Sequence, residues 1–449
     1  MTAKNSGLIY GLNDTPSFFP STFAAIQHVL ASFLSIAAPP LIIANALGLQ
    51  SEIPYLISMA FIISGVATYI QSRTIGPIGS GLLALQGTSF AFVGPLIAGG
   101  FIAKKAGASN EEVLALLFTA CFLGSFIEII LSQFMDKLRS IITPIVTGVV
   151  ITSIGVYLIK VGIIDMAGGF LAKKTGTFAS GQNLLLAFIV IAIIVILQCV
   201  KNKVLRLSSV FTGMLVGYLV ATGMGLIDFS KLGSTDLISI PIPFKYGFGF
   251  NWSILLTISF MYLVTAIETT GDLTAISEVS GEPVEGDLYM KRVKNGVLGD
   301  GVNSLLAAVF NTFPNTTFSQ GTGVIHITGV ASRKVGYFIG GIFVLLGLFP
   351  ITGELFKLIP RPVLGGALVI LFATIAVAGI RILASQEFNR RNMLIMAISF
   401  AFGFGVMLEP ALLSNAPDLF QRIFSSSITT SGVVAIIMTI VLPKSMDQE

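Results

Sequence analysis

Two acidic residues stand one helical turn apart in a strongly apolar part of the sequence. Glu268 and Asp272 are four positions apart, so both face one side of a helix, and Thr265 and Thr269 extend that polar face. A carboxylate at the bilayer centre costs roughly 2.5–3.5 kcal/mol, so a pair on one face indicates a polar cavity. Two carboxylates so close also favour keeping a proton, which offers a route to proton coupling. The alternative, open above all for Asp272, is a structural pair held by backbone amides and hydroxyls.

Other ionisable residues in apolar segments could serve either structure or function. Asp300 either ties spans together or relays protons, and Glu128 is suited to pairing with a neighbouring helix end. His28 and His326 are the only histidines of the chain. A lone histidine in a membrane segment is usually a structural donor whose hydrogen bond is satisfied, and this is the simpler interpretation of both.

The composition requires that these residues belong to an integral membrane protein. Of the 449 residues, 54% are hydrophobic and 11% are charged, whereas soluble domains have about 45–50% and about 25%. Water-soluble enzymes are therefore excluded. Two histidines and two cysteines, the latter in apolar stretches, make no convincing metal-ligand cluster, and the sequence lacks a phosphate-binding P-loop. We expect no enzymatic activity, no cofactor, no metal and no nucleic-acid partner.

Hydropathy predicts an all-α polytopic membrane protein with about fourteen spans. Most of the 26 Lys and Arg residues fall in segments on one side of this topology. Because cytoplasmic loops carry the excess of positive charge, both termini are expected in the cytoplasm, which requires an even number of spans. The expected location is the plasma membrane, the inner membrane in a bacterium.

Two short motifs recur about half a chain apart. Gln-Gly-Thr-Ser at 86–89 is echoed by Gln-Gly-Thr-Gly at 320–323, and residues 142–148 are echoed by 360–366. Two halves of seven spans each must be inverted in the membrane, because seven is odd, and inverted repeats are typical of secondary transporters. The third and tenth spans also hold many Gly, Pro and polar residues. Broken helices at corresponding positions of two halves indicate a substrate site.

Taken in order, these motifs resemble the nucleobase–ascorbate (nucleobase–cation symporter 2) transporters, and among them the bacterial xanthine and urate permeases. The family signature, [Q/E/P]-N-x-G-x-x-x-x-T-[R/K/G], matches in register, except that Gly321 stands where the family usually has Asn. The matching positions are Gln320, Gly323, Thr328 and Gly329. The resemblance extends over most of the chain through the segments 27–28, 86–90, 268–272, 299–301 and 313–333.

The resemblance implies a fold of two inverted seven-span repeats with short strands in spans 3 and 10. A core domain would combine residues 1–135 (spans 1–4) with 246–355 (spans 8–11). A gate domain would combine 136–245 (spans 5–7) with 356–449 (spans 12–14). The resemblance also implies a homodimer.

The resemblance further assigns roles to individual residues. Glu268 would bind the N–H groups of a purine, and Gln320 would read the edge of the base. The backbone near Ser89, Phe90 and Gly321 would complete the contact, while the Phe90 ring would either stack on the base or simply pack. The residues that would support the site and couple it to protons are Asp272, Asp300 and His28.

A purine of the xanthine or urate type presents alternating N–H and C=O groups, which a carboxylate and an amide can pair. We therefore expect purine import by proton symport with alternating access. A sulfate- or bicarbonate-type anion transporter of the same fold and a uracil-type permease remain alternatives. An anion would favour a cationic or helix-N-terminal site, and Glu268 counts against it. A channel or an intramembrane enzyme is a further class, which the repeat and the lack of a nucleophile–base pair disfavour.

Overall fold

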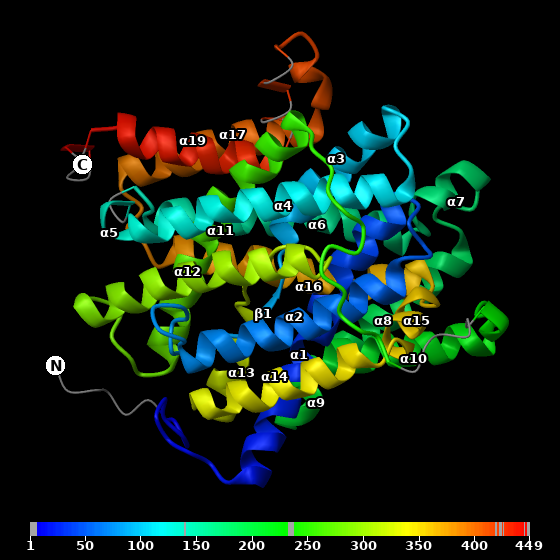
Figure 1. Cartoon of the computed structure of the whole chain (residues 1–449), viewed down its shortest axis with the longest axis horizontal. Coiled ribbons are helices and arrows are strands. Elements are labelled where there is room, and N and C mark those ends of the chain that lie inside the picture. The colour runs from blue at the N-terminus through cyan, green and yellow to red at the C-terminus, as the bar shows by residue number, and fades with distance from the viewer. Residues whose placement is uncertain are drawn as a thin grey trace.

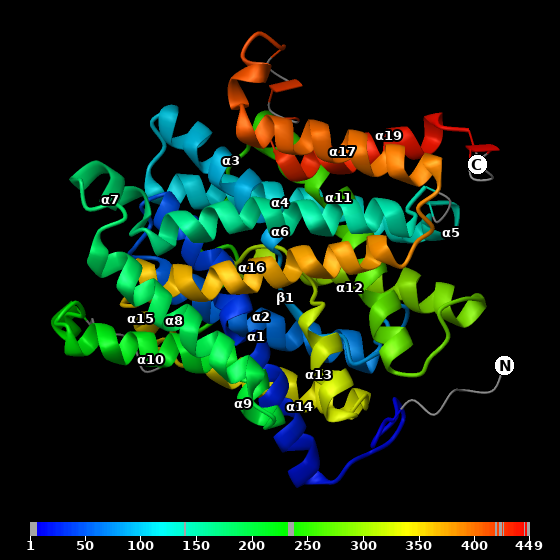
Figure 2. The same ribbon diagram turned by 180° about the vertical axis from the view of Figure 1, so that it is seen from behind.

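The computed structural model describes residues 7–138, 141–231, 238–417, 420–421, 424, 426–443 and 445–446. Long helices run side by side across the molecule (Figure 1 and, from behind, Figure 2). These are α1 (Phe18–Ala46), α2 (Ile53–Arg73), α4 (Asn110–Gln133), α6 (Pro144–Met166), α8 (Gly181–Cys199), α10 (Ser209–Gly223), α11 (Trp252–Val279), α12 (Asp287–Val309), α14 (Arg333–Leu348), α16 (Arg361–Ala384), α17 (Arg390–Leu408) and α19 (Ser427–Val441).

Shorter elements connect or interrupt these helices. The short helices are α3 (Val93–Lys105), α5 (Met135–Leu138), α7 (Gly169–Thr175), α9 (Lys203–Leu207), α13 (Gln320–Thr328) and α15 (Ile351–Lys357). The 3-10 turns are η1 (Phe90–Phe92), η2 (Phe229–Lys231) and η3 (Pro410–Leu413), and the strands are β1 (Gln86–Thr88) and β2 (Asn315–Thr317).

The helical, multi-pass class expected from composition is confirmed. Within the described residues, eight helices are long and apolar enough to cross a membrane, or nine if α14 and α15, bent by 73°, form one span. The apolar helices α10 and α19 are shorter. Helix α12, with 23 residues, is long enough to cross a membrane but carries several charged residues. The number of fourteen spans and the inverted repeat stay predictions.

Two strands meet in the interior of the helix bundle, as expected for the broken third and tenth segments. β1 and β2 pair antiparallel, with Gln86 opposite Thr317 and Thr88 opposite Asn315. The backbone groups of a broken helix at membrane depth need partners inside the protein, and this pairing supplies some of them. Each strand is followed by a short helix, which is α3 after β1 and α13 after β2.

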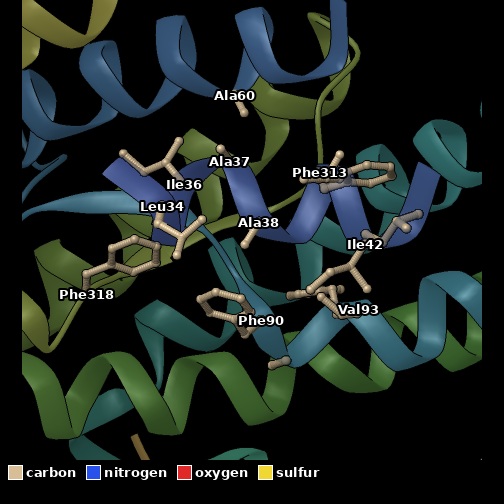
Figure 3. Close-up of a cluster of buried hydrophobic side chains, with 14 of the residues drawn as sticks. Leu34, Ile36, Ala37, Ala38, Ile42, Ala60, Phe90, Val93, Phe313 and Phe318 are labelled. Atoms are coloured by element: carbon tan, nitrogen blue, oxygen red, sulfur yellow. The ribbon is translucent and has the colours of Figure 1, made fainter. Parts of the chain in front are cut away.

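The strand pair can approach α1 closely because position 87 is glycine. A Cβ on Gly87 would overlap the ring of Phe318 and lie 3.0 Å from Ile36 Cγ1. Figure 3 shows Phe318 and Phe90 packed under the α1 side chains Leu34, Ile36 and Ala38. A dry apolar cover of this kind leaves the polar groups on the strands to pair with the helices on their other side.

The contacts between helices recur in matched pairs. α2 packs on α14 as α4 packs on α12, and α1 packs on α2 as α11 packs on α12. In the same way α8 packs on α10, and α17 packs on α19. The most extensive contact joins α6 to α16, where a Cβ on Gly155 would come within 2.6 Å of Ala376 Cα. Small residues allow helix backbones in a membrane to approach this closely.

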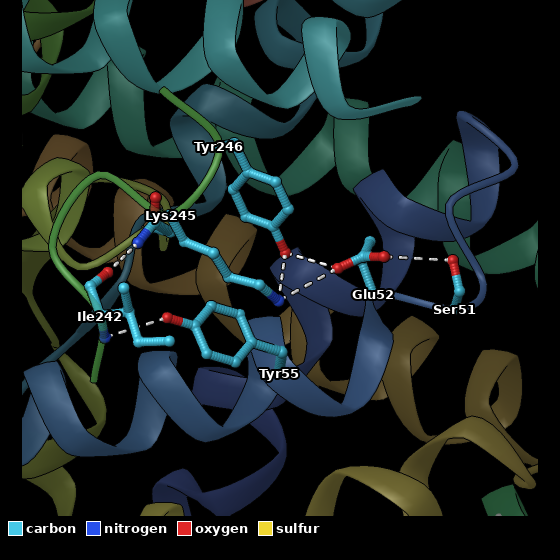
Figure 4. A network of polar contacts seen from close by, with 7 residues as sticks. Ser51, Glu52, Tyr55, Ile242, Lys245 and Tyr246 are labelled. Carbon is cyan, nitrogen blue, oxygen red and sulfur yellow. Dashed lines mark hydrogen bonds and ion pairs between the residues drawn. The ribbon is translucent and has the colours of Figure 1, made fainter. Parts of the chain in front are cut away.

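The chain between α10 and α11 is fixed to the ends of α2 and α12. Lys245 Nζ lies 3.8 Å from the centre of the Tyr55 ring and 3.5 Å from Glu52 Oε2, and Tyr246 donates a hydrogen bond of 2.5 Å to that oxygen (Figure 4). Burial, followed by this contact with Glu52, raises the pKa of Tyr246, so the phenol stays protonated and donates. Phe244 N bonds the last carbonyl of α12, at 2.7 Å.

Candidate substrate-binding site

The carboxylate of Asp300, in the middle of α12, is fully buried and joins three other elements. Oδ1 accepts a hydrogen bond from Gln71 Nε2 of α2 at 2.6 Å. Oδ2 accepts from Thr269 Oγ1 of α11 at 2.5 Å and from Thr317 N of β2 at 2.9 Å. Thr317 Oγ1 also donates to the carboxylate, at 3.1 Å from Oδ2. Of the two roles open from sequence, the geometry supports the one in which Asp300 ties spans together.

Gln71 is a buried partner that the sequence analysis did not single out. Its Nε2 donates to the Gly296 carbonyl at 2.8 Å as well as to Asp300, and its Oε1 accepts from Ser80 N at 2.8 Å. One polar amide near the end of an otherwise apolar helix was the available signal. Two of its partners, Gly296 and Asp300, lie more than two hundred positions away in sequence, so no local spacing indicates them.

Gln86, the first residue of the repeated motif, braces the two strands. Its Nε2 donates to Thr317 Oγ1 across the pair at 2.8 Å, and its backbone N–H bonds Thr68 Oγ1 of α2 at 3.0 Å. Asn303, one turn after Asp300, reaches Gln86 Oε1 at 3.5 Å. The motif in the third segment therefore holds β1 against β2 and α2 where the helix is broken.

Glu268 and Asp272 differ from Asp300 in having no donor. Glu268 is half-buried, and its Oε2 is buried without a hydrogen-bond partner. Asp272 is 4% exposed, and no hydrogen bond joins its carboxylate to a residue in the described part of the chain. Neither carboxylate forms an ion pair within the described residues. The alternative of a structural pair held by backbone amides and hydroxyls therefore has no supporting hydrogen bonds. Both carboxylates keep the capacity to accept hydrogen bonds from a ligand.

Gln320 and Gly321 begin α13, directly after β2. Gln320 is half-buried, and its amide makes no hydrogen bond within the described ranges. Gly321 is buried, is not among the positive-φ glycines, and a Cβ there would lie 3.5 Å from Leu85 Cβ, an ordinary contact. Because α13 packs against α11, the free amide of Gln320 belongs to the same region as Glu268.

Ser89 and Phe90 directly follow β1, and His28 lies in α1. The Phe90 ring meets Phe372 of α16 edge to face, with centroids 5.1 Å apart. This contact supports the interpretation in which Phe90 packs within the protein. The Ser89 hydroxyl accepts from Ala91 N and starts the 3-10 turn. His28 is fully buried, yet neither ring nitrogen has a partner among the described side chains. The expectation of a satisfied structural histidine is therefore wrong for His28.

The site residues of α11 lie where this helix meets β2 and both short helices. α11 contacts β2, η1, α3 and α13, while α12 contacts β2 and α2. A cavity of about 490 Å³ lies elsewhere, where α2 ends and α14 begins. Its lining residues are Asn13, Asp14, Thr15, Arg73, Thr74, Arg333, Lys334 and Tyr337.

Residues 20–412 match the model of a permease family, Xan_ur_permease. The xanthine permease XanP of Escherichia coli is 46% identical over 442 residues, which cover 98% of this chain and 96% of XanP. The chain belongs to this family of nucleobase–ascorbate transporters. XanQ of the same organism is 41% identical over 99% of this chain and 96% of its own length. The xanthine permease of Bacillus subtilis is 32% identical over 93% of this chain and 92% of its own length.

Solved structures support the fold of the permease. The transmembrane domain of a cyanobacterial bicarbonate transporter, BicA, aligns with a TM-score of 0.55 at 14% identity, covering 94% of this chain and 98% of that one. Murine Slc26a9, an anion transporter in the inward-facing state, aligns with a TM-score of 0.61 at 12% identity over 95% of this chain and 69% of its own. Because the named relatives are permeases, the protein is a transporter and not an enzyme.

Replacing Asp300 with Asn should lower the stability of the permease. An amide offers one acceptor oxygen and places N–H groups against donors, so at least one buried donor loses its partner, at a cost of about 1–3 kcal/mol. Thermal unfolding in detergent should show a lower midpoint for Asp300→Asn. Asp287→Asn, at the exposed start of the same helix, is the matched control. Equal midpoints for the two variants would contradict the structural role of Asp300.

Gly321→Asn should narrow the range of purine analogues without destroying transport. A Cβ at position 321 would meet only Leu85 Cβ, at an ordinary distance, and the position has no positive φ to strain a side chain. Competition by a panel of analogues against labelled xanthine uptake measures the range, with expression matched to wild type. Identical inhibition profiles would mean that position 321 does not face the ligand.

Proposed function

We propose that the protein imports a purine nucleobase of the xanthine or urate type by proton symport. The observation that carries this proposal is a contrast between two carboxylates, because Glu268 Oε2 of α11 is buried without a donor while Asp300 of α12 has donors at both oxygens. A buried carboxylate without partners is costly unless a ligand or a proton satisfies it. The names of the xanthine permease relatives give the ligand class.

The free groups of the site match the edge of such a base. The Glu268 carboxylate would accept two N–H bonds, and the Gln320 amide would both donate to a carbonyl and accept from an N–H. The backbone of Gly321, without a side chain, would add a donor at the start of α13. Asp272, next along the same face, would hold a proton during transport. The Phe90 ring would close the pocket on the side of α16.

Alternating access would arise from movement of a core domain against a gate domain. The matched helix contacts, in which α2 and α14 correspond to α12 and α4, support an inverted repeat with α6 and α16 on its axis. The core would combine residues 1–135 with 246–355, and Lys245 and Phe244, which directly precede residue 246, also contact α2 and α12 of that domain. The homodimer stays a prediction that depends on the resemblance.

We propose that both termini face the cytoplasm. The described segments nearest the two termini lie at the same end of the bundle in both views (Figures 1 and 2). That end also carries Arg73, Arg333 and Lys334 around the cavity, as the excess of positive charge inside requires. Other positions counted in the charge bias, Lys4, Arg139, Arg422 and Lys444, lie outside the described residues.

An anion or a uracil-type base is the alternative cargo. Likeness to BicA and Slc26a9 favours the shared fold alone, and the unpaired carboxylates of α11 would repel an anion. A uracil-type base shares the N–H and C=O pattern of xanthine. Counterflow of labelled xanthine, uracil and sulfate in proteoliposomes distinguishes the three cargoes, and sulfate exchange without xanthine exchange would overturn the proposal.

Glu268→Gln should severely impair uptake while the protein still reaches the membrane. The neutral amide forfeits the charge-assisted part of the hydrogen bonding, roughly 1.5–3 kcal/mol, which corresponds to about a 10- to 150-fold loss of affinity. Xanthine binding to purified protein and uptake into vesicles measure the effect. Glu278→Gln, exposed on the same helix, should behave as wild type. Near-normal transport by Glu268→Gln would remove this residue from the site.

Accumulation should follow an imposed proton gradient. Buried acidic groups offer protonatable sites, and the chain lacks a P-loop for ATP. In proteoliposomes, an inwardly directed proton gradient should drive labelled xanthine above equilibrium, and a protonophore should abolish the excess. Accumulation that resists the protonophore but requires sodium would identify sodium as the coupling ion.

A further inference from the structure

Glu128 of α4 is a buried carboxylate that the proposed site does not use. The residue is fully buried. Oε1 is 3.3 Å from Thr265 Oγ1 of α11, a long hydrogen bond. Oε2 is also buried and has no hydrogen-bond partner in the described part of the protein. The sequence analysis expected Glu128 to pair with a helix end, and the structure instead directs it toward the face of α11 that carries Glu268.

The groups that face Glu128 from neighbouring elements are acidic or neutral. α11 contributes Glu268 and Tyr262, and α12 contributes Asp300; the Tyr262 hydroxyl itself donates to the Cys121 carbonyl of α4, at 2.8 Å.

Two other elements, α3 and α5, pack against α4. Lys104 of α3 and Lys137 of α5 lie at the two ends of α4. Lys104 of α3 bonds Asn110 at the first residue of α4. Lys137 of α5 lies 6.0 Å from the Phe134 ring centre, beyond the last residue of α4. Neither bonds Glu128, which therefore has no ion-pair partner in the described structure.

The buried oxygen of Glu128 is poorly placed to carry a charge, so the charges of its neighbours determine when Glu128 holds a proton. An ionised carboxylate away from water costs far more than a neutral hydroxyl that lacks one hydrogen bond. The charge of Glu268 or Asp300 nearby increases this difference, because like charges disfavour a second ionisation. The single weak donor, Thr265 Oγ1, does not offset it.

We propose that Glu128 is a second proton-binding site, linked through Thr265 to the substrate site. The inference rests on the proposed proton symport. When purine N–H groups stabilise Glu268 as an anion, that charge favours proton uptake by Glu128, and by reciprocity a proton on Glu128 favours substrate binding. The proton comes from hydronium on the side to which the site is open. It forms an O–H bond at Oε2, leaves water behind, and returns to water on the other side.

Infrared difference spectroscopy on the full-length protein in lipid tests the protonation directly. Xanthine binding should produce a carbonyl band of a protonated carboxylic acid, and Glu128→Gln should remove it. Thr265→Val keeps the carboxyl group but removes its donor, so the band should shift in frequency. Glu111→Gln, exposed in the first turn of α4, should leave the band unchanged. An unaltered band in both Glu128→Gln and Thr265→Val would overturn the assignment.

Transport by the same proteins tests the coupling. Glu128→Gln should lose accumulation driven by a proton gradient to a greater extent than it loses xanthine counterflow, which needs no net proton movement. The number of protons moved per xanthine should fall. An unchanged ratio would mean that the proton on Glu128 is static, and would overturn the coupling role. Wild-type accumulation on a sodium gradient alone would contradict the proposed function, whereas the infrared band still reports the proton on Glu128.

Discussion

The Asp300 carboxylate is the interaction on which the interior of this permease depends. Two membrane segments are broken by strands, and a broken helix leaves backbone donors and acceptors without partners at membrane depth. Asp300 satisfies Thr317 N of β2, while Gln71 and Thr269 bring α2 and α11 to the same carboxylate. One buried carboxylate with several donors thereby joins α2, α11 and α12 to β2 of the strand pair.

The buried carboxylates of the core divide into saturated and unsaturated groups. Both oxygens of Asp300 accept hydrogen bonds, whereas Glu268 and Glu128 each retain an oxygen without a donor. An unsatisfied polar group in a native interior is a site of strain or of function. Helix α11 links the three groups: it carries Glu268, its Thr265 bonds Glu128 of α4, and its Thr269 bonds Asp300 of α12.

The outcome for individual residues shows how far sequence reasoning reaches in a membrane protein. The four-residue spacing of Glu268 and Asp272 predicted a shared helical face, polar residues in two corresponding segments predicted broken helices, and the family resemblance implied the strands. His28 was expected to be satisfied and is not, and Gln71 was missed. Both failures have one cause, because the presence or absence of a hydrogen-bond partner across the bundle leaves no trace in local periodicity.

The sequence alone determined that the chain is a multi-pass membrane protein of the nucleobase–ascorbate transporter family, because few charges and long apolar runs allow no other solvent and the ordered motifs are specific. Tertiary structure decided which carboxylates have hydrogen-bond donors at both oxygens. Asp300, Glu268 and Glu128 are alike as acidic residues in apolar helices. Only the packing of α2, α4, α11 and β2 gives donors to both oxygens of Asp300 and leaves one buried oxygen of each of the other two without a donor, since satisfaction of a buried charge depends on neighbours in space.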